Sequence, residues 1–401
     1  MTNNLEANFP PPAIPLSPVL STLSNNQKKD SSSITQSILD TRHQLHVSSG
    51  RAGIALALEH AGVSAGDEVL IPAFHCESMV TPIRRAGAEP IFFKVNLDAS
   101  IKLSDIEAKI TPRTKAILAT HYFGFPQNLA PLQKICEEYN LTLIEDCAHT
   151  FFGSFNGTSV GMWGDYAIAS SMKFFPVYDG GMLVSHTRNL DTLQLNRPPS
   201  GFQLKALFNI LERGLNYRRL GLLGKVLNLA LFTKSLIWKG LKALSKSNNP
   251  EISVGPSSAD GGYGLDENWI HKSASWPSTK IIERTNLAQL VTARRKNYLT
   301  IQHALSGING CRPLHESLPE GAVPLVCPIY IEQPQKHFAK LKHLGVPIWR
   351  FGEYLDQQIT KDLCANSIEL SAHIFQFPCH QELTDSEIDW MIETIKTELE
   401  T

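Results

Sequence analysis

A single lysine, Lys173, lies between two apolar segments of the sequence, Tyr166-Ala-Ile-Ala169 and Met182-Leu-Val184. Both segments are typical of buried strands, so the lysine is expected on a turn at the edge of a core. A buried ammonium ion is energetically costly, and a buried lysine is usually paired, neutral or covalently used. A neutral amine can form a Schiff base with a carbonyl group, including the aldehyde of pyridoxal phosphate (PLP). Lys173 is therefore a candidate catalytic residue, the alternative being an amine that extends to solvent.

A site for PLP also needs a carboxylate for the pyridinium nitrogen and a cradle for the phosphate. The candidate carboxylate is Asp146, which directly follows the strand-like segment Leu141-Thr-Leu-Ile144 and Glu145. His149, three residues further on, could cover one face of the ring. Each residue also has an ordinary alternative, because an aspartate at a strand end often caps a loop and a lone histidine is often structural.

The candidate phosphate cradle is the segment Ser48-Ser-Gly-Arg-Ala-Gly53, which leads into a helical pattern. Free N–H groups at the start of a helix bind phosphate, so Ser49 and Gly50 are candidate contacts, and Arg51 adds positive charge. Ser170 offers a hydroxyl three residues before Lys173. An ordinary helix N-cap at Ser49 is the alternative reading of the same segment.

The segments around these residues alternate between strand-like and helix-like patterns. Strands are predicted at residues 68–71, 90–95, 116–119, 141–144 and 166–169, and helices at about 52–62, 77–86, 103–109 and 129–139. This alternation predicts an α/β fold with a mostly parallel central sheet flanked by helices. Ligands of such sheets collect at the carboxyl ends of the strands, where Asp146 and Lys173 are expected.

Composition divides the rest of the chain. Residues 1–40 are rich in Pro, Ser and Asn and predict a flexible N-terminal arm, residues 41–290 a large domain, and residues 291–401 a small C-terminal α/β domain. Within the large domain, residues 203–264 form a basic amphipathic helical insert, because 203–246 carry six Lys and three Arg against one Glu. Thr384-Asp-Ser-Glu387 predicts a capping box at the start of the last helix.

Charge and cysteine usage exclude several classes of protein. The net charge of −1 gives no global attraction to nucleic acid. The seven cysteines have no metal-binding spacing, so no metal site is predicted, and their odd number favours a reducing compartment, hence the cytoplasm. The N-terminus lacks the pattern of a secretory signal. No G-x-G-x-x-G or P-loop motif follows a strand, which argues against dinucleotide-binding and P-loop enzymes.

Several motifs together resemble those of one enzyme family, the DegT/DnrJ/StrS family of PLP-dependent sugar aminotransferases, within the aspartate-aminotransferase fold type I. The similar segments are Ser49-Gly-Arg51, Gly66-Asp-Glu-Val-Leu-Ile-Pro-Ala-Phe74, Ala86-Gly-Ala-Glu-Pro-Ile-Phe92, Ile110-Thr-Pro-Arg-Thr-Lys-Ala-Ile117, His121-Tyr-Phe-Gly124, Ile144-Glu-Asp-Cys-Ala-His149, Val160-Gly-Met-Trp-Gly-Asp165, and Lys173 with Gly180-Gly181. Weaker similarity continues through Gln289-Leu290, Arg295-Lys-Asn-Tyr298 and Phe377-Pro-Cys-His-Gln-Glu-Leu-Thr384.

The resemblance implies roles for the candidate residues. Lys173 would form the Schiff base, Asp146 would hold the pyridinium nitrogen, His149 would stack on the ring, and Ser49, Gly50 and Arg51 would contact the phosphate. Gly214-Leu-Asn-Tyr-Arg218 resembles a family segment whose asparagine reaches the phosphate of a partner subunit, which gives that role to Asn216. The family further implies a homodimer.

The activity implied is transfer of an amino group from an amino acid, with glutamate expected, to a keto group of a nucleotide-linked sugar, for polysaccharide or glycoconjugate biosynthesis. One alternative is a sugar dehydratase of the same fold, although relatives of that kind replace the lysine with histidine. Another is a degenerate homologue without transaminase activity, associated with the inner face of the membrane through the basic insert.

Two departures from the family pattern direct attention to the substrate pocket. Tyr178 stands where the family usually has glycine, and His75 stands where it usually has threonine after Pro-Ala-Phe. Both are expected to affect the substrate pocket more than the cofactor site.

Overall fold

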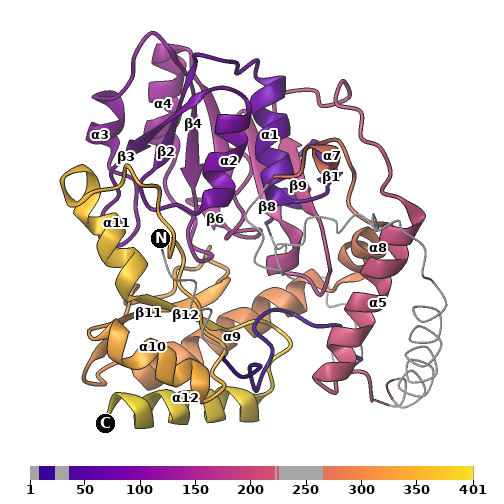
Figure 1. The fold of residues 1–401 in the computed structure, drawn as a ribbon, viewed down its shortest axis with the longest axis vertical. Coiled ribbons are helices and arrows are strands. Elements are labelled where there is room, and N and C mark those ends of the chain that lie inside the picture. The colour runs from indigo at the N-terminus through magenta and orange to yellow at the C-terminus, as the bar shows by residue number, and fades with distance from the viewer. Residues whose placement is uncertain (1–8, 23–35, 222–223, 225–264, 401) are drawn as a thin grey trace, which may run out of the picture.

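The structure is a computed structural model that describes residues 9–22, 36–221, 224 and 265–400. Two sheets organise the described chain (Figure 1). The first takes its strands from the N-terminal half, and the second from the C-terminal quarter. All the candidate site residues except Asn216 belong to the first half of the chain, so the first sheet is the scaffold that positions them.

The first sheet has seven strands in the order β1-β9-β8-β5-β4-β2-β3. The strands are β1 (His43–Val47), β2 (Glu68–Pro72), β3 (Glu89–Phe93), β4 (Thr114–Thr120), β5 (Thr142–Asp146), β8 (Tyr166–Ser170) and β9 (Gly181–Ser185). The five strands from β8 to β3 pair in parallel, whereas β9 pairs antiparallel with β8 and β1. The prediction of a mostly parallel central sheet is therefore confirmed.

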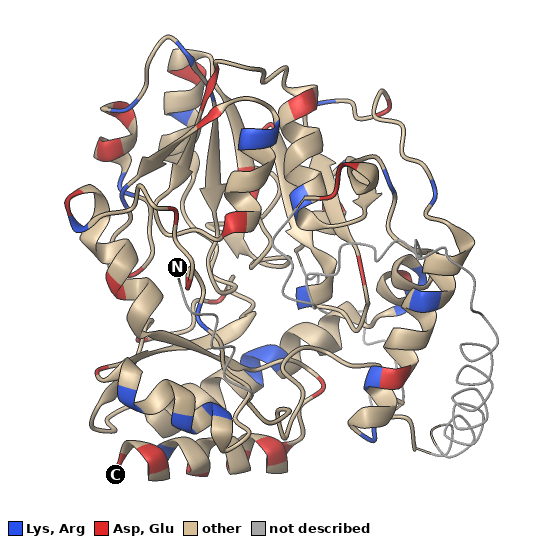
Figure 2. Cartoon of the chain, in the orientation of Figure 1, with Lys and Arg blue, Asp and Glu red and all other residues tan. Residues whose placement is uncertain are grey.

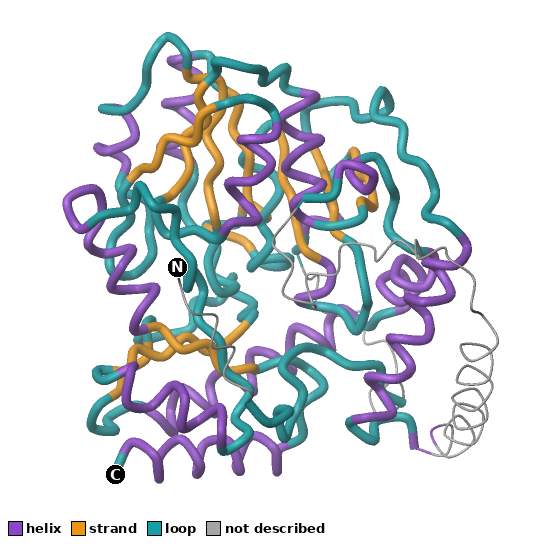
Figure 3. The backbone as a smooth tube through the Cα atoms, in the orientation of Figure 1, coloured by secondary structure: helices purple, strands orange, loops and turns teal. Residues whose placement is uncertain are grey.

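Helices cover both faces of this sheet, because successive strand residues point to opposite sides. Val69 and Ile71 of β2 pack in the same apolar cluster as α1 (Gly50–His60) and α2 (Glu77–Arg85), while Leu70 packs with α3 (Leu103–Glu107) and α4 (Ala130–Tyr139). The strands buried on both sides read as continuous apolar runs for this reason. The backbone trace shows the helices on either side of the strands (Figure 3).

The C-terminal part forms the second sheet, with the antiparallel order β10-β11-β12. Its elements are α9 (Leu287–Leu305), β10 (Cys311–Pro313), β11 (Val326–Ile331), α10 (Pro334–His343), α11 (Lys361–His373), β12 (Ile374–Pro378) and α12 (Asp385–Leu399). The predicted capping box is confirmed, because Thr384 and Glu387 bond each other's backbone N–H groups. The predicted domain boundary at residue 290 falls inside α9.

Three helices lie beside the first sheet: α5 (Ser200–Asn216), which covers the start of the predicted basic insert, and α7 (Glu267–Ile270) and α8 (Trp276–Arg284), which follow the insert. The predicted amphipathic pattern of residues 203–216 corresponds to α5, which buries Phe202, Ala206 and Ile210. Most of the rest of the predicted insert lies outside the described residues. Two very short strands, β6 (Ser154–Phe155) and β7 (Thr158–Ser159), complete the fold.

Residues 9–22 correct part of the prediction of a flexible arm. Ile14 and Val19 are buried, and Ala13 donates its backbone N–H to the carbonyl of Gly345 at 2.9 Å. At the other end, the side chain of Arg213 in α5 bonds Ser17 at 2.6 Å. The segment is thus fixed because it buries apolar side chains against the C-terminal part and α5. The other residues of the arm that precede 36 lie outside the described chain.

Charged residues are distributed over the whole described chain rather than gathered in one region (Figure 2). Opposite charges meet between α10 and α12, where Lys340 lies 3.3 Å from Glu398. Among the described helices, none combines the length and the apolar character needed to cross a membrane.

Candidate active site

The candidate site lies at the carboxyl ends of neighbouring parallel strands, as the fold class predicts. Asp146 is the last residue of β5, and β5 lies between β8 and β4. Strand β8 ends at Ser170 and continues directly into a short 3₁₀ helix, η3 (Ser171–Lys173). In the strand register, Asp146 pairs with Ile168 of β8. Lys173 comes five residues after Ile168, at the end of η3, so both residues lie at the same edge of the sheet.

The amine of Lys173 lies in surroundings that lower its pKa. The residue is half-buried, and burial of its amine lowers the pKa of that amine. The negative potential of Cys76 and Asp146 opposes that decrease. No hydrogen bond or ion pair within 4.0 Å engages the amine among the described residues. The surroundings therefore favour the neutral, nucleophilic form of Lys173 more than water does.

Asp146 is almost fully buried, with 3% of its surface exposed. Burial raises the pKa of its carboxyl group. Among the interactions that oppose the increase, the largest are the backbone N–H of Ala148, 2.9 Å from Oδ1, and the positive charge of Lys173. Asp146 and Lys173 interact electrostatically without forming a direct ion pair. A cationic group placed between them would gain the carboxylate as its partner.

His149 is also buried, and its ring is held by aromatic neighbours. Phe123 is stacked on it with ring centroids 5.8 Å apart, and Phe351 meets it edge-on at 4.7 Å. Burial first and the nearby charge of Lys173 second place the pKa of His149 well below its usual range, so the ring is neutral. Its Nδ1 atom is buried and has no hydrogen-bond partner. An unsatisfied polar atom here is consistent with a site shaped for a ligand.

The predicted cradle forms the start of α1. Ser49 is the N-cap, and its Oγ accepts the N–H of Ala52 at 3.2 Å. Strand β9 passes so close that a Cβ on Gly181 would lie 2.6 Å from the nitrogen of Gly50, which requires glycine at that position. A Cβ built on Gly50 would in turn lie 3.7 Å from that of Ser170. The helix start and Ser170 therefore lie side by side, and a helix start of this kind suits an anion.

Arg51 belongs to the same turn of α1 and is 5% exposed. Burial lowers the pKa of its guanidinium, and the thiol of Cys76 opposes that decrease. The electrostatic contacts of Cys76 thus extend from Arg51 at the cradle to Lys173 and Asp146. Six of the predicted residues around Lys173 are brought to one edge of the sheet: Ser49, Gly50, Arg51, Asp146, His149 and Ser170.

Asn216 is not part of this group within one chain. It is the last residue of α5 and is exposed, and no hydrogen bond joins it to the other site residues in the described chain. A role toward a partner subunit remains a prediction.

The two departures from the family pattern have structural explanations. His75 is fully buried, accepts the N–H of Asp356 at Nε2 (3.1 Å) and donates from Nδ1 to the carbonyl of Ala73 (2.9 Å). Tyr178 packs with Phe202 of α5 and Trp269 of α7 in a separate apolar cluster. Both side chains are committed to packing, so the expectation that they reshape the substrate pocket gains no support from their contacts.

Two residues near the site were missed in the sequence. Cys76 is the only partly accessible cysteine. No role was predicted for it, although it directly follows the Pro-Ala-Phe-His segment. Arg294 of α9 bonds the backbone carbonyl of Lys173 at 3.1 Å. Its separation of 121 residues leaves no local signal.

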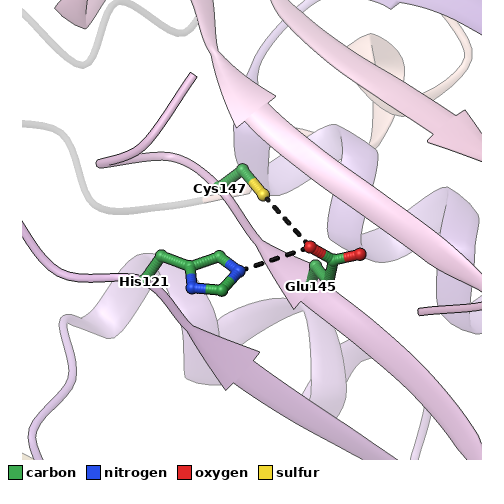
Figure 4. A group of neighbouring side chains, drawn as sticks. All are labelled: His121, Glu145 and Cys147. Atoms are coloured by element: carbon green, nitrogen blue, oxygen red, sulfur yellow. Dashed lines mark hydrogen bonds and ion pairs between the residues drawn. The ribbon is translucent and has the colours of Figure 1, made fainter. Parts of the chain in front are cut away.

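A second polar cluster, behind Asp146, is formed by His121, Glu145 and Cys147 (Figure 4). His121 accepts the backbone N–H of Gln127 at Nδ1 (2.9 Å), so its proton is on Nε2, which faces Glu145 at 3.3 Å. Glu145 also accepts the backbone N–H of Gly161 at 2.9 Å. A metal would need the lone pair that the proton on Nε2 occupies, so this cluster is a structural hydrogen-bond network.

The residues present fit PLP on three observations. Within the described chain the amine of Lys173 has no hydrogen-bond or ion-pair partner, the carboxylate of Asp146 is buried without an ion-pair partner, and the start of α1 lies beside Ser170. An aldehyde, a pyridinium nitrogen and a phosphate are the groups that these three sites would satisfy.

Comparison with known proteins agrees with this assignment. Residues 34–218 match the family model of the DegT/DnrJ/EryC1/StrS aminotransferase family, which confirms the predicted resemblance. The chain is 34% identical over 152 residues to GDP-perosamine synthase of Vibrio cholerae, a match of 37% of this chain and 41% of that protein. It is 34% identical over 156 residues to UDP-N-acetyl-3-dehydro-alpha-D-glucosamine 3-aminotransferase of Acidithiobacillus ferrooxidans, covering 37% and 42%. The chain spans less than half the length of these curated relatives.

The fold extends further than the sequence similarity. A DegT/DnrJ/EryC1/StrS aminotransferase from Brucella abortus superposes with a TM-score of 0.61 at 20% identity, over 90% of this chain and 86% of that one. The predicted fold class is confirmed.

Proposed function

We propose, from the family resemblance carried by residues 34–218, that the protein is a PLP-dependent aminotransferase. The amino group would pass from an amino acid, with glutamate as the expected donor, to a keto group of a nucleotide-linked sugar. The observation that carries the proposal is the position of two groups at the same edge of the sheet. One is the amine of Lys173, which has a lowered pKa, and the other is the buried carboxylate of Asp146.

Each residue has a defined part in this proposal. PLP, when bound, supplies an aldehyde for the amine and an electron-withdrawing ring. Asp146 would hold the proton on the ring nitrogen, and His149 would lie against the ring. Ser49, Gly50, Arg51 and Ser170 bind the phosphate. Lys173, as a neutral amine, would carry the proton to and from the α-carbon of the donor.

The class of acceptor is supported by the relatives. One similar protein is named for a GDP-linked product and another for a UDP-linked 3-keto sugar. We extend only the shared chemistry to this chain: a keto sugar joined to a nucleoside diphosphate. Polysaccharide or glycoconjugate biosynthesis is the process that consumes such aminated sugars.

The rival functions differ at Lys173. A sugar dehydratase of this fold would replace the lysine by histidine, and a degenerate homologue would have no reason to keep an unpartnered amine opposite Asp146. Retention of both residues favours transamination.

The assembly and location belong to the same proposal. A homodimer would place Asn216 of one subunit at the phosphate of the other. The free state of all seven cysteines supports a reducing compartment, the cytoplasm. Contact of the basic insert with the inner face of the membrane remains a proposal.

The test is isotope transfer. The protein with PLP is incubated with ¹⁵N-amino glutamate and a panel of GDP- and UDP-linked keto sugars, and the products are analysed by mass spectrometry. Transfer of ¹⁵N to a sugar supports the proposal and identifies the acceptor. Sugar deoxygenation without ¹⁵N transfer would support the dehydratase, and 2-oxoglutarate formation without any aminated sugar would reject the acceptor class.

A further inference from the structure

Arg294 is a fully buried cation in the middle of α9. Burial lowers its pKa to about 10, so the guanidinium is still charged at neutral pH. None of the described carboxylates lies within ion-pair distance of it. Such a charge is costly to bury and needs all its N–H groups satisfied.

All five N–H groups are directed at carbonyl oxygens. Nε donates to the side-chain oxygen of Gln381 (3.0 Å), Nη1 to the backbone oxygens of Pro324 and Leu325 (3.1 Å each), and Nη2 to those of Lys173 (3.1 Å) and Phe174 (3.5 Å). The guanidinium also lies over the ring of Phe174, 4.6 Å from its centroid.

These acceptors come from three separate segments. Lys173 and Phe174 follow β8 of the large sheet, whereas the segment 324–325 leads into β11 and Gln381 follows β12. Gln381 adds a bond of its own, from Nε2 to the oxygen of Phe174 at 3.0 Å. Arg294 and Gln381 therefore attach the backbone of the Lys173 turn to the C-terminal part.

The turn needs this external support because η3 is only three residues long. Within it, the backbone N–H groups of Phe174 and Phe175 bond the oxygen of Ser171 at 3.2 and 2.9 Å. Because η3 ends at Lys173, no following helical turn provides N–H donors for the backbone oxygens of Lys173 and Phe174. Without Arg294, both would lose a charged donor in a buried place.

We infer that Arg294 is a positioning residue for Lys173: its guanidinium fixes the turn that holds the amine near Asp146. The inference rests on the proposed function for the role of Lys173. It assigns Arg294 no contact with substrate.

The chain offers a matched control in Arg295, the next residue of α9. Its guanidinium also bonds backbone oxygens, with Nη1 at 2.8 Å from Pro319 and 3.1 Å from Glu320, but these lie outside the Lys173 turn. We compare Arg294→Lys, which keeps the charge and loses the planar fork, with Arg295→Lys. Gln381→Leu is a second variant that removes one support without deleting the buried charge.

The first readout uses the protein without cofactor. The pH dependence of acetylation of Lys173, followed by peptide mass spectrometry, gives the apparent pKa of its amine. In Arg294→Lys the amine is expected to move toward solvent and its pKa to rise toward the ordinary value of about 10.4. Gln381→Leu should shift it less in the same direction, and Arg295→Lys should leave it unchanged.

The second readout is kinetic. For Arg294→Lys we expect kcat to fall by about 100-fold, as for a small misplacement of a reacting group, with the KM for glutamate much less affected. Folded Arg294→Lys and Gln381→Leu proteins with an unchanged pKa of Lys173 would overturn the inference. The variants could shift the pKa of Lys173 while the wild-type protein transfers no amino group. That result would support the positioning role and reject only the proposed function.

Discussion

At the scale of single residues, the account depends on charges that the protein keeps apart. Asp146 and Lys173 lie at one sheet edge without a direct bond, so each is available to a bound group. The sequence predicted both residues because an aspartate and a lysine at strand ends carry a local signal. It could not predict Arg294, since nothing local distinguishes a buried helical arginine from an exposed one.

Asp146→Asn tests the carboxylate. The amide has the same shape but cannot hold a proton on the ring nitrogen by charge, and loss of such an electrostatic partner costs about 100-fold in kcat. We expect that loss with an unchanged melting temperature, measured by a coupled glutamate assay and thermal denaturation. Asp98→Asn, on an exposed turn, is the control. Full activity of Asp146→Asn would contradict the assigned role.

His75 makes stability depend on pH. Burial lowers its pKa to about 4, against about 6.5 in the unfolded chain. Between these values the unfolded state binds more protons, so the free energy of unfolding falls as the pH falls, by at most about 1.4 kcal/mol per pH unit.

Urea unfolding between pH 7 and 4 measures this slope. His75→Asn, which removes the titrating ring, should show a smaller slope than wild type over the same range. Equal slopes would mean that His75 is not the source. Buried His315 and His380, with pKa values lowered to about 4 and about 3, and buried His149, whose pKa is also lowered by burial, should contribute to the acid sensitivity that remains.

At the scale of elements, each strand and helix predicted in the first 170 residues lies within two residues of its observed ends, whereas β1, β6 and β7 were not predicted. They are short apolar runs separated by amphipathic segments, and the pattern alone sets their type. The antiparallel pairing of β9 with both β8 and β1 was not predicted, because register between distant strands depends on contacts that periodicity does not encode. The close approach of Gly181 to Gly50 belongs to the same class of information.

Asp179 links the loop after Lys173 to the start of α8. It is buried and accepts the backbone N–H of Ser275 (2.8 Å) and the hydroxyls of Ser275 (2.5 Å) and Ser278 (2.6 Å). Asp179→Ala should lower the free energy of unfolding by about 1–3 kcal/mol, because it leaves buried donors unsatisfied.

Chemical denaturation of Asp179→Ala and of Asp266→Ala makes the comparison. Asp266 caps α7 through the N–H of Asn268 at 3.0 Å in an exposed place, so its loss should cost about 1 kcal/mol or less. A larger loss of unfolding free energy in Asp266→Ala than in Asp179→Ala would contradict the stabilising role assigned to the buried hydrogen bonds of Asp179.

At the scale of the whole molecule, residues 9–22 cross from the C-terminal part to α5. Composition predicted a flexible arm here because Pro, Ser and Asn dominate, yet a few apolar side chains suffice to fix the segment. Buried His380 supports it, since Nε2 lies 2.9 Å from the carbonyl of Pro15. Long-range contacts of this kind cannot be read from composition.

Ile14→Ala tests that docking. Ile14 is 4% exposed, and truncating a buried isoleucine costs about 2–5 kcal/mol in the free energy of unfolding. Leu16, on the same segment and 37% exposed, is the control, and Leu16→Ala should cost within about 0.5 kcal/mol. Equal effects of the two substitutions in urea denaturation would show that the segment does not contribute through Ile14.

The central claim is that Lys173 holds PLP and gives it up to an amino donor. The most direct measurement is the visible absorption spectrum of the purified protein with added PLP, for wild type and Lys173→Ala, before and after glutamate. The account predicts a cofactor band that requires Lys173 and is bleached by glutamate. A band that does not depend on Lys173, a band that no amino donor changes, or no band at all would contradict it.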